Sequence, residues 1–177
     1  MTTYLLLLRG INVSGANIVK MADFRAFLAD LGFERVETYI QSGNAVFSSS
    51  DSAEQAGRRV ADAFPARFGF LPKMMLIPAG EFASAVEGNP FSDPHIDPAR
   101  LHLGFMAEEP AEAAAALLAL KPSGSAEYRI KGRVFYLTTP DGIGNSQFAS
   151  LIEKTLKVPV TFRNWRTVLA LAKLPST

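Results

Sequence analysis

Polar residues that could bind a ligand gather in two loops near the beginning of the chain. Residues 10–17 and residues 41–44 are rich in glycine and asparagine, and each loop follows a strand-like run. Glycine lets a ligand approach the backbone closely, while amide, hydroxyl and guanidinium groups bind polar or anionic groups. The candidate ligand-binding residues in and beside these loops are Arg9, Asn12, Asn17, Gln41, Ser42 and Asn44. The same residue types also build tight turns, so a structural role stays open as an alternative.

A second group of polar residues lies in segments 141–146 and 163–166. Each segment precedes a predicted helix, whose free N–H groups attract anions. Asp141 could act as a general base or orient Arg163, although an Asx turn is the favoured interpretation. Trp165 could stack on a ligand, or it could anchor the start of a helix. The candidate ligand-binding residues are Asp141, Ser146, Arg163, Asn164, Trp165 and Arg166, and none is assigned a catalytic role.

Several common chemistries are not supported by the residues present. Residues 10–15 have the glycine spacing of a P-loop, but Ala16 and Asn17 stand where lysine and serine or threonine are needed. The glycines of segment 142–144 lack the third glycine of a dinucleotide fingerprint. No serine lies in a nucleophile elbow. We therefore expect no nucleotide cofactor and no strong serine nucleophile.

The histidines do not indicate a metal site. Segment 93–97 contains two aspartates and His95, but it is rich in proline and is expected to be an exposed turn with solvated carboxylates. His102 opens a predicted strand and is expected to be a structural histidine. Cysteine is absent, which excludes disulfides and thiolate metal ligands. The sequence predicts no bound metal.

Composition limits the class of protein. The chain has 177 residues, 48% of them hydrophobic, which is enough for a sizeable core. Its net charge of +1 provides no overall field that would attract nucleic acid. The longest N-terminal apolar run, residues 5–8, is too short for a signal peptide or a membrane span. We expect a cytoplasmic protein that does not bind membranes.

Hydrophobic periodicity predicts an α+β fold made of two ferredoxin-like βαββαβ halves in tandem, with a C-terminal helix. The first half covers residues 1–78, a short helix and a connector cover residues 79–99, and the second half with the C-terminal helix covers residues 100–177. Ser52 and Gln55 are spaced as a capping box for the second helix, and Asn164 is placed to cap the last one. The predicted strands are 4–8, 36–40, 45–48, 73–77, 101–106, 128–130, 134–137 and 158–162.

This topology brings the polar segments together. In a βαββαβ half, the loop after the first strand and the hairpin between the second and third strands lie at one end of the sheet. Residues 10–17 and 41–44 should therefore meet. In the second half, residues 141–146 and 163–166 should meet at the opposite end.

The same segments resemble a known family, the bacterial domain-of-unknown-function 1697 family. The resemblance rests on LLRGINV at 7–13, KM at 20–21, YIQSGN at 39–44, NPF at 89–91, PDGIG at 140–144 and RNW at 163–165. It implies an α+β fold and a bacterial cytosolic setting, and it implies no activity. The family pattern has glycine and lysine where this chain has Ser14 and Ala16, and often arginine and lysine in place of Asn145 and Gln147. These differences remove three cations that could contact phosphate.

Three functions follow from these observations. The first is binding of a small polar or anionic ligand at the Gly/Asn-rich loops. The second is an RNA-contacting or protein-interaction module, because residues 131–136 faintly resemble the base-stacking strand of RNA-recognition domains. Phe135 and Tyr136 must point to opposite faces, however, so only one could stack. The third is an enzyme that positions its substrate by polar contacts without a strong nucleophile.

Overall fold

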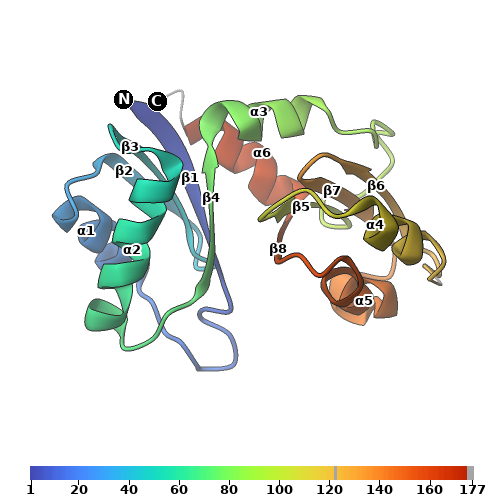
Figure 1. The fold of residues 1–177 in the computed structure, drawn as a ribbon, viewed down its shortest axis with the longest axis horizontal. Helices are drawn as coiled ribbons and strands as arrows, with labels where there is room; N and C mark the ends of the chain where they lie inside the picture. Colours follow the sequence, from blue (N-terminus) through green and yellow to red (C-terminus); the bar gives the residue numbers. More distant parts are fainter. Residues whose placement is uncertain (122, 175–177) are drawn as a thin grey trace. The chain divides into compact units, whose positions relative to one another are not determined.

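The computed structural model describes residues 1–121 and 123–174. Its contacts divide the chain into two units, Met1–Val86 with the residues from Ala170 onward, and Glu87–Leu169. Each unit contains one four-stranded antiparallel sheet with helices, which confirms the predicted pair of ferredoxin-like halves (Figure 1). The predicted C-terminal helix is present as α6 (Trp165–Lys173). Within the described residues, no helix is long and apolar enough to cross a membrane.

The first sheet has the strand order β2-β3-β1-β4, as the βαββαβ connectivity requires. Leu5 and Leu7 alternate with Leu6 and Leu8 along β1, and all four are fully buried, because β1 is a central strand covered on both faces. The elements of this unit are β1 (Thr2–Arg9), α1 (Met21–Asp30), β2 (Glu34–Tyr39), β3 (Asn44–Ser49), α2 (Ala53–Phe68), β4 (Lys73–Pro78) and α3 (Ala79–Glu87).

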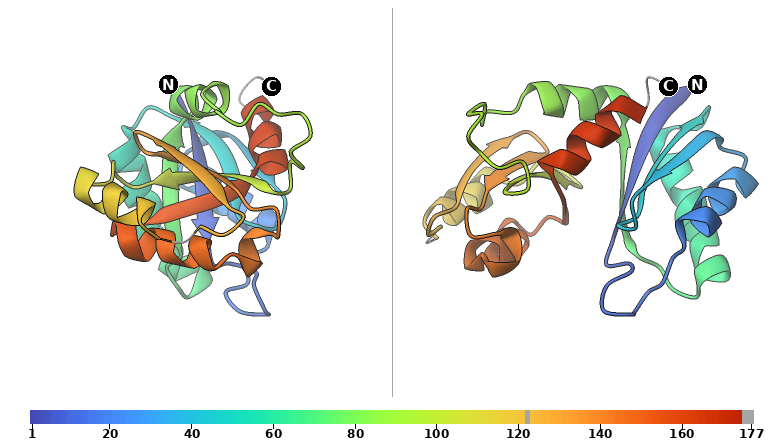
Figure 2. Two further views of the ribbon diagram at one scale, coloured as in Figure 1. Left: turned by 90° about the vertical axis from the view of Figure 1, so that its right-hand side faces the viewer. Right: turned by 180° about the vertical axis from the view of Figure 1, so that it is seen from behind.

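Helices α1 and α2 cover one face of this sheet, as the right-hand view of Figure 2 shows. Phe24 and Phe27 of α1 contact Phe64 of α2 edge to face, with ring centroids 6.3 and 5.6 Å apart. Phe33 stacks on Phe47 of β3 at 4.2 Å. Aromatic side chains thus fill the space between the helices and the sheet.

The second sheet repeats the order as β6-β7-β5-β8. One core cluster lies on the face of this sheet where Phe135 stacks on Tyr128 at 5.1 Å and packs with Phe148 and Ile152. The elements are β5 (Leu101–Met106), α4 (Glu112–Ala119), β6 (Glu127–Lys131), β7 (Val134–Thr138), the 3-10 helix η1 (Ile143–Asn145), α5 (Gln147–Leu156) and β8 (Val160–Asn164).

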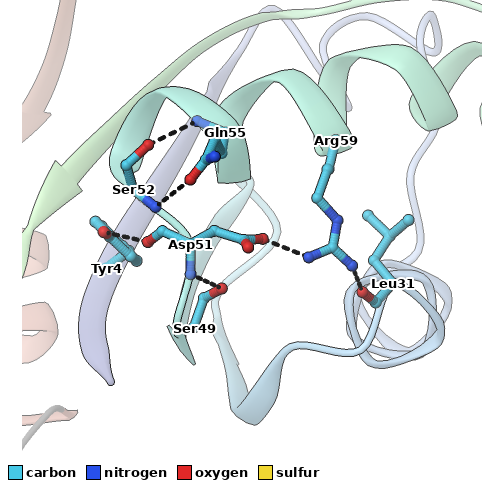
Figure 3. A network of polar contacts seen from close by, with 7 residues as sticks. All are labelled: Tyr4, Leu31, Ser49, Asp51, Ser52, Gln55 and Arg59. Atoms are coloured by element: carbon cyan, nitrogen blue, oxygen red, sulfur yellow. Dashed lines mark hydrogen bonds and ion pairs between the residues drawn. The ribbon is translucent and has the colours of Figure 1, made fainter.

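The start of α2 forms the capping box that the sequence predicts (Figure 3). The Gln55 N–H donates to Ser52 Oγ at 3.2 Å, and the Ser52 N–H donates to Gln55 Oε1 at 3.0 Å. One turn further along, the Arg59 guanidinium donates to both the Asp51 carboxylate and the Leu31 carbonyl oxygen. These contacts join the start of α2 to the end of α1.

Two details differ from the sequence prediction. The last strand begins at Val160 and not at residue 158, because Lys157 ends α5 in a left-handed conformation (φ 60°) and Pro159 has no N–H to donate. Strand β2 contains a bulge between Glu34 and Glu37, where Arg35 has φ 51°. The alternation of side chains in β2 is therefore interrupted, which apolar periodicity alone does not reveal.

Candidate functional site

The two Gly/Asn loops of the first unit meet at one end of its sheet, as the topology requires. Asn12 Nδ2 donates to the Gln41 carbonyl oxygen at 2.8 Å and to the Val19 carbonyl oxygen at 2.9 Å. The Leu8 N–H donates to the Gly43 carbonyl oxygen at 2.7 Å. The 10–17 loop and the 41–44 hairpin therefore form one connected structure.

The asparagine side chains in these loops bind their own backbone. Asn17 Nδ2 donates to the Gly10 carbonyl oxygen at 3.0 Å, and the fully buried Asn44 donates to the Tyr39 carbonyl oxygen at 3.0 Å. Asn12 and Asn17 both have positive φ, which asparagine tolerates better than most residues. The structure thus gives these three asparagines the turn-forming role. Arg9, Gln41 and Ser42 are exposed, and their binding of a ligand stays a prediction.

The polar segments of the second unit also reach a common end of their sheet. Leu137 of β7 and Asn164 of β8 flank His102 of β5 on opposite sides. Both strands therefore finish at the end of the sheet where β5 begins, as the sequence predicts. Their side chains nevertheless separate into two groups: Asp141 and Ser146 line a small pocket, whereas the residues that leave β8 contact the segment before β5.

The first group surrounds a small pocket beside Asp141. Asp141 Oδ2 accepts a hydrogen bond from Ser125 Oγ at 2.6 Å, and the Asp141 carbonyl oxygen accepts one from Asn145 Nδ2 at 3.1 Å. Ser146 caps α5 by accepting a hydrogen bond from the Ala149 N–H at 3.2 Å. The volume enclosed is about 240 Å³. This group is small and is held largely by turn and capping contacts.

The residues that leave β8 contact the connector, which we define as residues 88–100. The Trp165 N–H donates to the Pro98 carbonyl oxygen at 3.1 Å, and Arg166 Nη2 lies 3.1 Å from Asp97 Oδ1. Asn164 accepts a hydrogen bond from the Thr167 N–H at 2.9 Å, which confirms its predicted role as a cap. Burial lowers the pKa of the Arg163 guanidinium to about 10.

The connector forms one wall of a larger pocket of about 740 Å³, which we call the connector pocket. Turns shape this wall: Asp93 Oδ1 accepts a hydrogen bond from the His95 N–H, and Asp97 Oδ1 accepts one from the Ala99 N–H, both at 2.8 Å. The lining residues are Pro90, Phe91, Ser92, Asp93, His95, Ile96, Asp97, Arg100, Glu127, Thr138 and Pro140. The volume falls within the range of pockets that hold small molecules.

Arg100 is the one guanidinium among these lining residues, and Gly142 makes room for it. A Cβ built on Gly142 would overlap Arg100 Nη1. Gly142 also has φ 90° and ψ 144°, a conformation that residues with a Cβ atom rarely adopt. The Gly-rich loop of the second unit therefore positions a cation of the pocket. This role could not be assigned from the glycine pattern alone.

Two contacts hold the backbone at Arg100. Its carbonyl oxygen accepts a hydrogen bond from the Thr139 N–H at 2.9 Å and lies 3.3 Å from His102 Nδ1. His102 is buried, and burial lowers the pKa of its imidazole. This confirms the structural role predicted for His102.

Three carboxylates face the pocket beside the single guanidinium. They belong to Asp93, Asp97 and Glu127. The Ala99 N–H lowers the pKa of Asp97 most strongly, and Arg166 and Arg100 lower it further. Because Arg166 compensates Asp97, the pocket offers two further carboxylates and one cation to a ligand.

The sequence prediction did not include Arg100, Glu127 or Asp93 among the ligand-binding residues. Arg100 directly precedes a predicted strand, at the sheet end where polar segments were already expected to converge, and that position was the available signal. Asp93 was treated only as a turn residue. It is both a turn residue and part of a pocket wall.

The strand that resembles an RNA-binding motif has its aromatic rings engaged. Phe135 lies in the core against Tyr128, while Tyr136 is 1% exposed on the opposite face, with Lys131 Nζ 5.7 Å from its ring centroid. The two rings do point to opposite faces, as expected from strand geometry. Neither is available for stacking on a base in this conformation.

Comparison with known proteins identifies a family and a similar solved structure. A family model described as "Protein of unknown function (DUF1697)" matches residues 1–136. None of the curated proteins compared matches the chain significantly. Among solved structures, the conserved bacterial protein SP0830 from Streptococcus pneumoniae is similar, with 29% sequence identity, 98% coverage of both chains and a TM-score of 0.77.

Proposed function

Since this chain belongs to the DUF1697 family of proteins of unknown function, we propose a function from its own geometry: the connector pocket binds a small polar ligand. The observation that supports this most is the convergence of Arg100, Glu127 and Asp93 in one pocket of about 740 Å³. Two of these residues come from the connector and one from the edge strand β6. A pocket with a few convergent polar groups on partly apolar walls is typical of small-molecule sites.

The charges favour a ligand with both a cationic and an anionic group. Arg100 can bind a carboxylate or phosphate group through paired N–H donors, while Glu127 and Asp93 attract an amine. A ligand with only negative charge would face more carboxylates than guanidinium groups in the pocket. Phe91 and Ile96 add an apolar wall for the carbon skeleton. We therefore propose an amine-bearing zwitterion, such as a free amino acid or an amino sugar phosphate.

Trp165 allows a direct test, because it is the only tryptophan of the chain. Its backbone N–H donates to the Pro98 carbonyl oxygen, so the residue is attached to the connector. We would titrate the protein with free amino acids, diamines, amino sugar phosphates and inorganic phosphate while measuring tryptophan fluorescence. The expected result is a saturable change with a zwitterionic probe and a much weaker change with phosphate alone.

Variants then locate the response. Arg100→Gln should weaken binding about tenfold or more, because it removes a charge-assisted hydrogen bond from the ligand. Glu127→Gln should weaken binding of the same probe. Arg58→Gln is the matched control, since Arg58 is an exposed arginine of α2 whose partner is Glu54. Equal binding by the Arg100→Gln variant and the control would disprove this site.

Nucleic-acid binding is the weaker candidate, because Phe135 and Tyr136 are buried and the pocket is rich in carboxylates. The exposed Arg9, Gln41 and Ser42 of the first unit could form a separate ligand contact, and the same titrations with an Arg9→Gln variant would reveal it. The proposed setting is the cytoplasm, where a chain without cysteine suits a reducing environment.

A further inference from the structure

Strand β6 is an edge strand with hydrogen-bonding groups directed away from its sheet. Within the described residues, it pairs only with β7, in an unbroken register from Glu127 opposite Thr138 to Lys131 opposite Val134. A two-residue turn joins the strands, so the pairs of residues 131, 129 and 127 with β7 exchange hydrogen bonds. The N–H and C=O groups of Tyr128 and Ile130 therefore point outward.

A side-chain contact agrees with this orientation. Arg129 Nη1 donates to the outward carbonyl oxygen of Tyr128 at 2.7 Å. An incoming strand would replace this side-chain contact with a backbone hydrogen bond. The edge is thus open to strand addition at its centre.

The corresponding edge of the first unit is built differently. Strand β2 occupies the same place in the order of its sheet, but its bulge and the left-handed Arg35 interrupt the edge. A bulge of this kind protects an edge strand from pairing with another chain. The second unit has the same topology, but its edge strand β6 lacks a bulge. An unprotected edge strand favours aggregation unless another strand pairs with it.

The surface next to β6 is suited to receive apolar side chains. A groove of about 510 Å³ runs between β6 and α4, lined by Ala115, Tyr128 and Ile130 among others. Leu117 of α4 is 48% exposed, and Leu120, just after this helix, is 81% exposed. Exposed large apolar side chains on the helix that borders the groove are a feature of interaction surfaces.

The sequence of β6 is complementary to itself. If two copies pair antiparallel with Tyr128 opposite Tyr128 of the second copy, Glu127 stands opposite Arg129 in both directions. The same register places Ala126 opposite Ile130, so a small apolar residue faces a large one at each end of the paired strands. Opposite charges and apolar pairs facing each other stabilise antiparallel strands.

We propose that the β6 edge and the adjacent α4 surface form a twofold interface between two copies of this chain. The partner is a second copy because the charges of β6 match those of β6 itself in this register. A twofold axis perpendicular to the sheet keeps both α4 helices on the same face, where Leu117 and Leu120 of the two copies can cover each other. The interface shares Glu127 with the connector pocket, whose proposed ligand the same carboxylate would attract.

The test uses charge exchange and analytical ultracentrifugation of the full chain. The wild-type protein should sediment with twice the mass of one chain. Glu127→Arg and Arg129→Glu should each place like charges opposite each other twice and raise the dimer dissociation constant about tenfold or more. The Glu127→Arg/Arg129→Glu double variant should restore the dimer, and an equimolar mixture of the two single variants should form a heterodimer.

The controls make the result specific to this register. Glu34→Arg introduces the same charge change on the bulged edge strand β2 and should leave the dimer intact. Leu120→Asp should weaken the dimer through α4 without changing β6. A wild-type protein that sediments as a single chain, or a double variant that stays monomeric while the wild-type protein dimerises, would overturn the proposal. All samples are measured without added ligand, so a failure of the dimer and a failure of ligand binding can be told apart.

Discussion

Replacing Gly142 with alanine should damage both the stability of the second unit and its ligand pocket. Gly142 has φ 90° and ψ 144°, and alanine in such a conformation costs about 1–3 kcal/mol. The added Cβ would also overlap the Arg100 guanidinium, which has to leave its position. We expect a total loss of about 2–4 kcal/mol in the free energy of unfolding, together with a loss of the fluorescence response to zwitterionic probes.

Urea unfolding followed by the fluorescence of Trp165 measures this change, since Trp165 belongs to the second unit. Gly144→Ala is the matched control: it lies in the same loop, nothing lies within 4 Å of a Cβ built there, and its φ is not positive. That variant should change stability by no more than about 0.5 kcal/mol.

A double-mutant cycle separates the two causes. Removing the guanidinium with Arg100→Ala relieves the overlap but not the backbone strain, so the double variant should lose less than the sum of the single losses. Strictly additive losses would show that the Arg100 contact is irrelevant to the Gly142 conformation. Equal stability of the Gly142→Ala and Gly144→Ala variants would refute the whole argument.

Four further predictions follow from single residues. Ser52→Ala removes the capping box of α2 and should lower the free energy of unfolding by about 1 kcal/mol, whereas Ser50→Ala, outside the box, should have little effect; denaturant titration compares them. Gly57→Ala should raise the melting temperature. Gly57 lies inside α2, the nearest atom to a Cβ added there is 4.0 Å away, and alanine inside a helix is about 0.5–1 kcal/mol more stabilising than glycine. Gly104→Ala should lower it, because the Cβ would lie 2.5 Å from the Phe162 ring, and overpacking costs about 1–3 kcal/mol. His102 should make the protein less stable in mild acid, as a pH series of unfolding experiments would show.

The sign of the His102 effect follows from its burial. Its folded-state pKa lies below the ordinary value of 6.5, so the unfolded chain binds the proton more readily. The contribution of the neutral His102 to the free energy of unfolding is fully present above about pH 6.5. It is lost as the pH falls from there toward the folded-state pKa. His102→Gln should flatten this part of the pH dependence. A stability that is constant over this range in the wild-type protein would contradict the interpretation.

Much of the fold could be predicted from local patterns. The spacing of Ser52 and Gln55 located the start of α2, and Asn164 located the start of α6, because caps act on neighbouring residues. The order of strands and helices predicted both sheets correctly. The bulge at Arg35 and the late start of β8 were missed, since they depend on backbone conformation and on hydrogen bonding to a neighbouring strand.

The site was only partly predictable. The sequence correctly predicted that the 10–17 loop contacts the 41–44 hairpin and that β7 and β8 finish at the same end of their sheet. Both features follow from the connectivity of the strands. It did not indicate that Asp141 would bond to Ser125 while Arg166 would contact Asp97. Side-chain partners of this kind depend on distances across the fold.

By itself, then, the sequence determined the α+β class, the two βαββαβ units and the ends of the sheets at which polar residues collect. These properties depend on periodicity, caps and chain connectivity, which are local or topological. Only the tertiary structure decided that the connector, with Asp93 and Arg100, would meet Glu127 in a pocket, and that Gly142 would make room for the Arg100 guanidinium. The physical reason is that a pocket arises from the packing of segments far apart in the chain, whereas turns and caps arise from neighbours.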